Sequence, residues 1–203
     1  MKKIYLVLLL AVGFSMNSQV TFTPGIRGGL NLSNLTETNG SYKPDFYLGG
    51  FGAINFTKVY TLQPEINYSK QGANGVREET YDFNSGTYNY NDKDLTINYL
   101  SLSAMNKFTI AEKFQIMVGP TLDFIVGDNL AYRYSDGDLG INFGFGYKFS
   151  SGISVEARFK KGFLDILDSG YYDYGNDFLF GSWNSNNVFQ FGVSYAFDLK
   201  KKQ

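Results

Sequence analysis

Hydrophobic and polar residues alternate along most of the chain, as in the segment "LQPEINYSK" at residues 62–70. On an extended backbone, Ile66 and Tyr68 fall on one side of this segment, and Glu65 and Asn67 fall on the other. Alternation of this kind predicts a β-strand with one apolar face and one polar face. A soluble protein turns such an apolar face inward, whereas a membrane barrel turns it outward to lipid.

Eight segments share this period of two, and we predict that each forms a strand. The cleanest is "LGINFGFGYKF" at residues 139–149, in which apolar residues alternate with glycine, Asn142 and Lys148. In the segment at residues 45–56, glycines blur the period and leave its two faces ambiguous. The eight segments are residues 22–32, 45–56, 62–70, 98–108, 114–124, 139–149, 153–160 and 188–197.

The connections between these segments alternate between long and short. Residues 33–44, 71–96, 127–138 and 161–187 form the long connections, and residues 57–60, 109–113 and 150–152 form the short ones. Long loops at one end and tight turns at the other are typical of outer-membrane barrels. We therefore predict an all-β, eight-stranded, antiparallel up-and-down transmembrane β-barrel with both mature termini in the periplasm. Turn residues and mixed charge in residues 74–94 are consistent with a hairpin that extends the sheet above the membrane.

Phenylalanines recur where the predicted strands meet the short turns or the termini. Such rings at one level of a closed sheet form an interfacial girdle between hydrocarbon and headgroups. The alternative is hydrophobic plugging at the bottom of a soluble barrel. Together with the export signal described below, the girdle favours apolar faces that point outward into lipid. These phenylalanines are Phe22, Phe56, Phe108, Phe114, Phe149 and Phe197.

The polar faces of the strands place charged residues inside the predicted barrel. An eight-stranded barrel has an interior only just wide enough for side chains to fill, so we predict a filled lumen and no diffusion pore. Unpaired buried ions are costly, so we expect Glu65, Asp123 and Glu156 to pair with basic side chains among Arg27, Lys107 and Arg158. A hydrated lumen without fixed pairs is the alternative. The predicted network consists of Arg27, Glu65, Lys107, Asp123, Lys148, Glu156 and Arg158.

The first residues have the features of a signal peptide. Lys2 and Lys3 precede the apolar run at residues 4–14, which is too short to span a bilayer comfortably as a helix. We predict cleavage after Ser18, with Ser15 as the alternative, so that residues 1–18 form the signal and residues 19–203 the barrel domain.

Composition excludes much catalytic chemistry. The 203-residue chain contains no cysteine and no histidine, which removes thiolate metal sites, the usual general base and the commonest metal ligand. The net charge of −1 gives no basis for nucleic-acid binding. We therefore expect no enzyme activity, no cofactor and no metal.

One acidic, tyrosine-rich loop at residues 165–183 could contact a ligand or a partner. Its aspartates at positions 168, 173 and 177 offer oxygen atoms to a cation, but their spacing fits no EF-hand pattern. Its aromatic residues suit either a recognition surface or stacking on the barrel mouth. These aromatic residues are Tyr171, Tyr172, Tyr174 and Trp183.

Several segments together resemble the porin-like or PorT-like outer-membrane β-barrel family that is abundant in Bacteroidetes. They are "GIRGGLNLSNL" (25–35), "LQPEINYSKQG" (62–72), "INYLSLSAMNKF" (97–108), "VGP" (118–120) and "VFQFGVSYAF" (188–197). The resemblance implies an eight-stranded outer-membrane barrel without catalytic residues, and one branch of the family is linked to protein secretion. The sequence "DLKKKQ" after Phe197 departs from barrels that end on an aromatic residue recognised by the insertion machinery.

We expect an outer-membrane barrel that acts by anchoring, adhesion or assistance to secretion or assembly. The expected partners are outer-membrane lipid, the barrel-insertion machinery and an extracellular or secretion-system protein. The first alternative is a secreted, soluble, lipocalin-like carrier of a small ligand, which also uses eight up-and-down strands. The second is a narrow channel for small solutes, which the crowded lumen disfavours.

Overall fold

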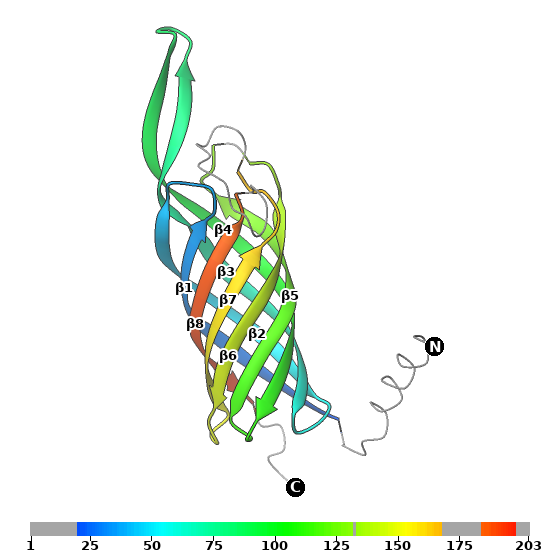
Figure 1. The fold of residues 1–203 in the computed structure, drawn as a ribbon. Helices are drawn as coiled ribbons and strands as arrows, with labels where there is room; N and C mark the ends of the chain where they lie inside the picture. Colours follow the sequence, from blue (N-terminus) through cyan, green and yellow to red (C-terminus); the bar gives the residue numbers. More distant parts are fainter. Residues whose placement is uncertain (1–19, 132, 168–183, 198–203) are drawn as a thin grey trace, which may run out of the picture.

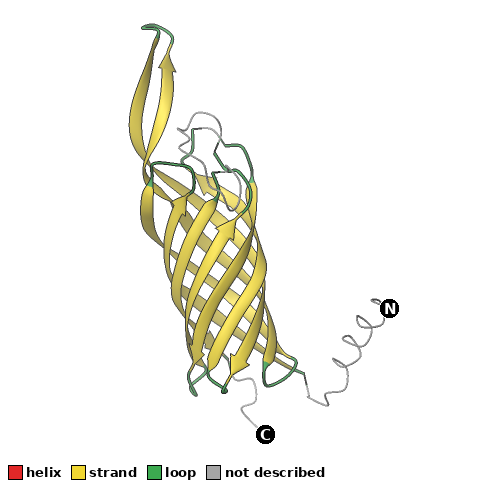
Figure 2. Ribbon diagram, in the orientation of Figure 1, coloured by secondary structure: helices red, strands yellow, loops and turns green. Residues whose placement is uncertain are grey.

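The computed structural model describes residues 20–131, 133–167 and 184–197. The strands are β1 Thr21–Leu35, β2 Ser41–Asn55, β3 Tyr60–Asp82, β4 Thr87–Ile110, β5 Phe114–Asp128, β6 Gly137–Lys148, β7 Ile153–Gly162 and β8 Asn186–Ala196. Each strand pairs antiparallel with the next in sequence, and β8 pairs with β1 to close the barrel (Figures 1 and 2). No helix in the described ranges is long and apolar enough to cross a bilayer. The predicted eight-stranded up-and-down barrel is confirmed.

The two ends of the barrel differ as expected. Three tight turns, at residues 56–59, 111–113 and 149–152, lie at the end where the described chain also begins and finishes (Figure 1). This end is called the short-turn end below. The longer connections and one projecting hairpin lie at the opposite, long-loop end.

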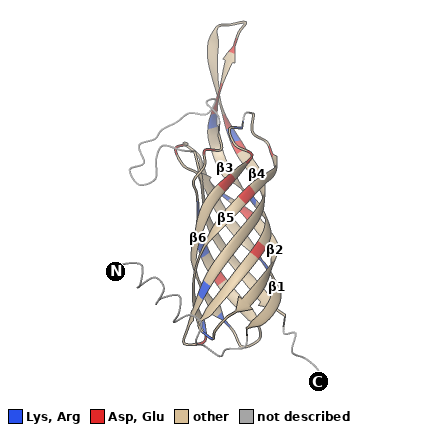
Figure 3. Ribbon diagram, turned by 90° about the vertical axis from the view of Figure 1, so that its right-hand side faces the viewer, with Lys and Arg blue, Asp and Glu red and all other residues tan. Residues whose placement is uncertain are grey.

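The outer wall of the barrel is apolar and its interior is polar. Leu30 and Leu48 expose 61% and 62% of their surfaces, whereas the inward-facing Arg27 and Glu65 expose 3% and 5%. Uncharged positions dominate the strands of the wall in Figure 3. A closed sheet pairs all of its backbone N–H and C=O groups internally. A structure that spans a bilayer must do so, because hydrocarbon offers no hydrogen-bond partners. The arrangement therefore suits lipid outside and a polar filling inside.

Aromatic rings surround the short-turn end, where the sequence predicts a girdle. All six predicted phenylalanines are exposed there. Tyrosines join them: the Tyr60 ring stacks on Phe56 and contacts Phe108, and the Tyr147 ring packs edge-on against Phe114. These rings form one outward-facing aromatic belt at a single level of the wall.

Strands β3 and β4 continue past the barrel rim as a two-stranded hairpin (Figure 1). The pairing of β2 with β3 ends at Asn74, and the pairing of β4 with β5 begins at Ile97. A bulge marks the exit from the barrel, because Asn74 and Gly75 together oppose one residue of β4. Gly75 has φ of 65°, which glycine adopts without strain, and its N–H donates to the Asp94 carboxylate over 2.9 Å.

The lumen is closed at the long-loop end by a small apolar cluster. Tyr99 in this cluster is fully buried, and its hydroxyl accepts a 2.7 Å hydrogen bond from the Asn186 amide. Ile125 and Leu130 pack against the cluster from its edge. The buried members are Leu35, Ala73, Val76, Leu95, Ile97, Tyr99, Ile166 and Leu167.

Candidate functional site

The centre of the lumen holds a cluster of ion pairs built around two carboxylates. Glu65 on β3 accepts a 2.7 Å hydrogen bond from Arg27 of β1. Both terminal nitrogens of Arg158 on β7 donate to the same carboxylate, each over 2.9 Å. Glu65 therefore joins three strands across the barrel axis, through side chains that expose almost no surface.

Glu156 on β7 is the second carboxylate of the central cluster. It accepts 2.7 Å hydrogen bonds from Lys107 on β4 and from Arg158, and Arg27 lies 3.5 Å away. The Ser194 hydroxyl of β8 donates to it as well, over 3.3 Å. The five predicted network residues Arg27, Glu65, Lys107, Glu156 and Arg158 thus lie together and form mutual ion pairs.

Asp123 does not pair with the basic residues expected for it. It forms an ion pair with Lys160 of β7 and accepts a 3.2 Å hydrogen bond from Thr121. Asp123 and Lys160 lie nearer the long-loop end than the central cluster, so Arg27 and Lys107 are too far along the barrel axis. The Lys160 ammonium also lies over the Tyr99 ring, 5.3 Å from its centre.

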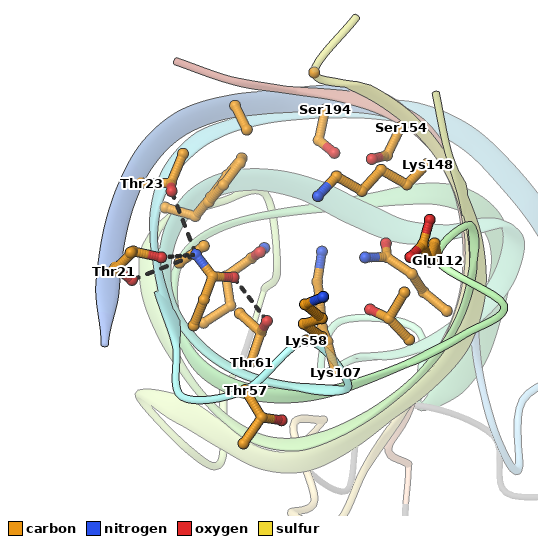
Figure 4. Close-up of a pocket in the computed structure, with 18 residues that line it drawn as sticks. Thr21, Thr23, Thr57, Lys58, Thr61, Lys107, Glu112, Lys148, Ser154 and Ser194 are labelled. Atoms are coloured by element: carbon orange, nitrogen blue, oxygen red, sulfur yellow. Dashed lines mark hydrogen bonds between the residues drawn. The ribbon is translucent and has the colours of Figure 1, made fainter. Parts of the chain in front are cut away.

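Lys148 is the predicted network member that the structure leaves out. It is exposed at the short-turn end of β6 and forms no ion pair among the described residues. The alternation correctly predicted that Lys148 faces inward. Lys148 lies at the end of its strand, however, nearer the short-turn end than Glu156. Lys148 instead lines an open cavity at that end of the barrel (Figure 4).

Packing leaves little space in the middle of the lumen. The gap between Arg27, Asn67 and Arg158 has a volume of about 10 Å³, which is roughly what one water molecule requires. The Nε atoms of both arginines and the Oδ1 atom of Asn67 have no hydrogen-bond partner among the described residues. Side chains therefore fill the middle of the lumen.

Two glycines make room for the bulky side chains of this cluster. A Cβ atom on Gly192 would lie 1.9 Å from the Tyr47 hydroxyl, and one on Gly144 would lie 2.7 Å from Cγ of Arg158. Tyr47 packs its ring against the Arg27 guanidinium at 4.6 Å and accepts a 3.2 Å hydrogen bond from it. The inward-facing glycines therefore let a narrow barrel hold long charged residues.

Sequence reasoning missed Tyr47, Lys160 and Asp138 as members of the lumen filling. Tyr47 lies on the strand whose alternation is blurred by glycines, so its inward direction was not evident. Asp138 is the second residue of β6 and accepts hydrogen bonds from the backbone N–H groups of Phe163 and Leu164. The inward parity of Lys160 on β7 could have identified it as a further partner.

The β3–β4 hairpin presents a second candidate site, an aromatic surface outside the barrel. Tyr81 and Tyr88 are a cross-strand pair with ring centres 4.9 Å apart, and Phe83 packs edge-on against Tyr81 at 5.0 Å. Phe83 exposes 90% of its surface, and Tyr90 is also exposed. These four residues are called the hairpin aromatic face below.

The hairpin tip is a tight turn organised by Asp82. Its carboxylate accepts 2.9 Å hydrogen bonds from the Asn84 N–H and the Ser85 hydroxyl. The bond from the Asn84 backbone, followed by that from Ser85, lowers the pKa of the Asp82 carboxyl. Gly86, with φ of 67°, donates its N–H to the Asp82 carbonyl over 2.8 Å and closes the turn.

The remaining sequence predictions fall on residues outside the described ranges. They concern the signal segment 1–18, the aspartates of the acidic loop at 168, 173 and 177, and its aromatic residues Tyr171, Tyr172, Tyr174 and Trp183. Each of these stays a prediction. Within the described residues, no group of three or more acidic side chains is placed to hold a metal ion.

Comparison with known proteins decides the family. The model of the outer membrane protein beta-barrel domain family matches residues 10–168, which is more than half of the chain. The chain belongs to this family. As an outer-membrane barrel it lies in lipid, so the apolar wall faces hydrocarbon and the soluble carrier alternative is wrong. The match leaves the PorT-like branch and the bacterial group untested.

Solved structures include proteins to which this chain is similar. Neisserial surface protein A (NspA) is 10% identical, with a TM-score of 0.52, over 89% of this chain and 100% of its own. Ail, the attachment invasion locus protein of Yersinia pestis, is 13% identical, with a TM-score of 0.47, over 87% of this chain and 99% of its own. The search of curated proteins found no match.

Proposed function

We propose that this outer-membrane barrel is an interaction protein, whose β3–β4 hairpin contacts a partner outside the cell. The single observation that carries the proposal is the hairpin aromatic face, which projects beyond the rim of a filled barrel. Exposed tyrosine and phenylalanine are enriched at protein interfaces, where they provide large contact areas at low entropic cost. The proposal includes no catalytic role, since the chain lacks histidine and cysteine.

The filled lumen supports a contact role over a transport role. Two arginines and one lysine bind Glu65 and Glu156 across the barrel axis, and the apolar cluster lies above them. A solute crossing the barrel would have to break these buried ion pairs, and separating one buried pair costs several kcal/mol. We therefore expect the protein to conduct neither ions nor small solutes, which disfavours the narrow channel.

Beyond the rim, the two hairpin strands pair with each other in a continuous ladder. Ion pairs join Arg77 to Asp92 over 3.6 Å and Lys93 to Glu78 over 3.7 Å across its two strands. No further described strand pairs with either outer edge beyond the rim. Unpaired strand edges can accept an extended segment of a partner by main-chain hydrogen bonding. The hairpin therefore offers both an aromatic face and free edges.

The proposal is tested by shortening the hairpin in cells that display the protein. In the variant, residues 79–90 are replaced by an Asn-Gly turn, which suits a two-residue hairpin. A control carries Gly-Gly in place of Ser150 and Ser151, which are exposed in the β6–β7 turn at the opposite end of the barrel. We expect displayed wild-type and control chains to increase adherence to host-protein-coated surfaces or to neighbouring cells, and the shortened chain to lose this gain.

The outcome that contradicts the proposal is equal adherence of wild-type and shortened chains at equal surface levels. Surface levels are measured by biotin labelling of intact cells, and heat-modifiable mobility of the extracted barrel verifies folding. A second reading comes from planar lipid bilayers, in which wild-type protein should show no conductance steps. Stable steps from the purified barrel would favour the channel alternative.

A further inference from the structure

The barrel contains an open cavity at its short-turn end, on the opposite side of the central cluster from the hairpin. Its volume is about 430 Å³, and its wall carries hydroxyl and amide groups together with three lysines and one glutamate. The lysines are Lys58, Lys107 and Lys148, and the glutamate is Glu112. Figure 4 shows Lys148 extending into this opening from one side and Lys58 and Lys107 lying close together on another.

The floor of the cavity has an excess of positive charge. In the central cluster, three cations, Arg27, Lys107 and Arg158, meet two carboxylates, Glu65 and Glu156. The buried acids that balance the lumen lie farther away, because Asp123 and Asp138 are near the long-loop end with Lys160. One positive charge of the central cluster is therefore uncompensated, and an uncompensated buried charge is costly.

The mouth of the cavity adds to this charge. Lys58 lies in the β2–β3 turn and Lys148 at the end of β6, and neither forms an ion pair with a carboxylate among the described residues. Glu112, from the β4–β5 turn, is the one acidic residue of the described cavity wall. Counting Lys58 and Lys148 against Glu112 leaves one further positive charge at the mouth.

The groups of the cavity wall suit an anion with several oxygen atoms. The carboxylates of Glu65 and Glu156 do not line the cavity. Their oxygens accept hydrogen bonds from the two arginines and Lys107. The cavity wall also carries the hydroxyls of Thr109 and Ser154, which can donate further hydrogen bonds. Hydrogen bonds between ammonium groups and carboxylate or phosphate oxygens are among the strongest that proteins form.

We propose that this cavity binds a small anion that carries carboxylate or phosphate groups, held between Lys58, Lys107 and Lys148. By the family layout, short turns lie on the periplasmic side, so the anion enters from the periplasm. This anion site is independent of the contact role proposed for the hairpin, so either proposal can be wrong while the other holds. A bound anion would neutralise the excess positive charge of the central cluster. The barrel would then bind a solute of the periplasm.

The test uses the full mature barrel in nanodiscs of zwitterionic lipid, so that the bilayer contributes no anionic headgroups. Citrate serves as the carboxylate probe, pyrophosphate as the phosphate probe and glucose as the uncharged control, each titrated by calorimetry. The variants are Lys148→Gln and the double variant Lys58→Gln with Lys148→Gln. Lys113→Gln is the matched control, because Lys113 is exposed at the same end and does not line the cavity.

We expect one saturable site for citrate or pyrophosphate and no heat from glucose. Removal of one charge-assisted contact should weaken binding about tenfold for Lys148→Gln, the double variant should lose it, and Lys113→Gln should bind as the wild type does. Equal weakening by Lys113→Gln, or no saturable binding by the wild type, would overturn the proposal. Heat-modifiable gel mobility verifies that each variant is folded.

Discussion

Arg158 on β7 binds Glu65 on β3 through both of its terminal nitrogens, each 2.9 Å from a carboxylate oxygen, although 93 residues separate the two in sequence. Because β3 and β7 lie on different sides of the ring, this bidentate pair crosses the lumen and ties opposite walls together. Arg27 completes the contact from β1. The Arg158–Glu65 pair therefore lies at the centre of the side chains that fill the lumen.

Replacement of Glu65 by glutamine is expected to destabilise the barrel strongly. The change keeps the side-chain volume but leaves Glu156 as the one carboxylate that Arg27, Lys107 and Arg158 share. Breaking a buried ion pair from one side costs about 3 to 5 kcal/mol. Urea unfolding in lipid vesicles measures the loss. Glu79→Gln in the hairpin is the control and should stay within about 0.5 kcal/mol of the wild type; an equal loss in both variants would contradict the role of Glu65.

Addition of a side chain at Gly192 is expected to prevent correct closure of the barrel. A Cβ atom there would lie 1.9 Å from the Tyr47 hydroxyl and 2.6 Å from the Gly28 carbonyl oxygen. Gly192→Val should therefore abolish heat-modifiable mobility on gels. Gly50→Val is the matched control, because a Cβ atom at Gly50 would lie 3.6 Å from its nearest neighbour, and it should fold normally. A normally folded Gly192→Val barrel would show that the lumen is less tightly filled.

The sequence predicted the strands and their inward faces because a closed barrel in lipid imposes a strict period of two. It did not predict the partner of Asp123, since pairing across a lumen depends on how far each strand is shifted along the barrel axis. This shift between strands is set by the hydrogen-bond register, and the alternation within a single strand does not reveal it. For the same reason Lys148 was placed inside, but its level was not known.

The hairpin was evident only in part for a different physical reason. Above the lipid both faces of β3 and β4 meet water, so residues such as Glu78 and Glu79 need not alternate with apolar ones. The turn chemistry of Asp82 and Gly86 was the remaining signal. The inward direction of Tyr47 was hidden because glycines at positions 49, 50 and 52 belong to both faces of β2.

Acidification is expected to loosen the hairpin tip. The pKa of Asp82 is lowered in the fold by hydrogen bonds from Asn84 and Ser85, so its stabilisation is present above the ordinary aspartate pKa of about 4. The stabilisation is lost as the pH falls through the lowered pKa. The Asn84 amide signal in NMR spectra should shift below about pH 4, as its hydrogen bond to the Asp82 carboxylate weakens. Asp82→Ala should remove this pH dependence, and an unchanged Asn84 profile in that variant would rule out Asp82 as its source.

A charged residue on the apolar wall is expected to lower the stability of the barrel, whereas the same residue on the hairpin is expected to have little effect. Leu102 faces outward near the middle of β4, so Leu102→Arg should lose about 2 to 4 kcal/mol of unfolding free energy. Tyr88→Arg in the hairpin is the control and should change stability by less than about 0.5 kcal/mol. Unfolding in lipid vesicles provides both values. Equal stability of the two variants would mean that Leu102 does not meet hydrocarbon.

The most direct test of the inside-out barrel is the accessibility of two positions on β3 that face opposite sides of the wall. The chain has no cysteine, so single cysteines at Ile66, on the outer face, and at Thr61, which lines the open cavity, can each carry a nitroxide spin label in the membrane-embedded protein. We predict that oxygen, which dissolves in lipid, relaxes the label at position 66 strongly, while a water-soluble nickel complex does not reach it. The label at position 61 should be relaxed by the nickel complex through the open cavity. Strong nickel relaxation at position 66 with none at position 61 would contradict the account.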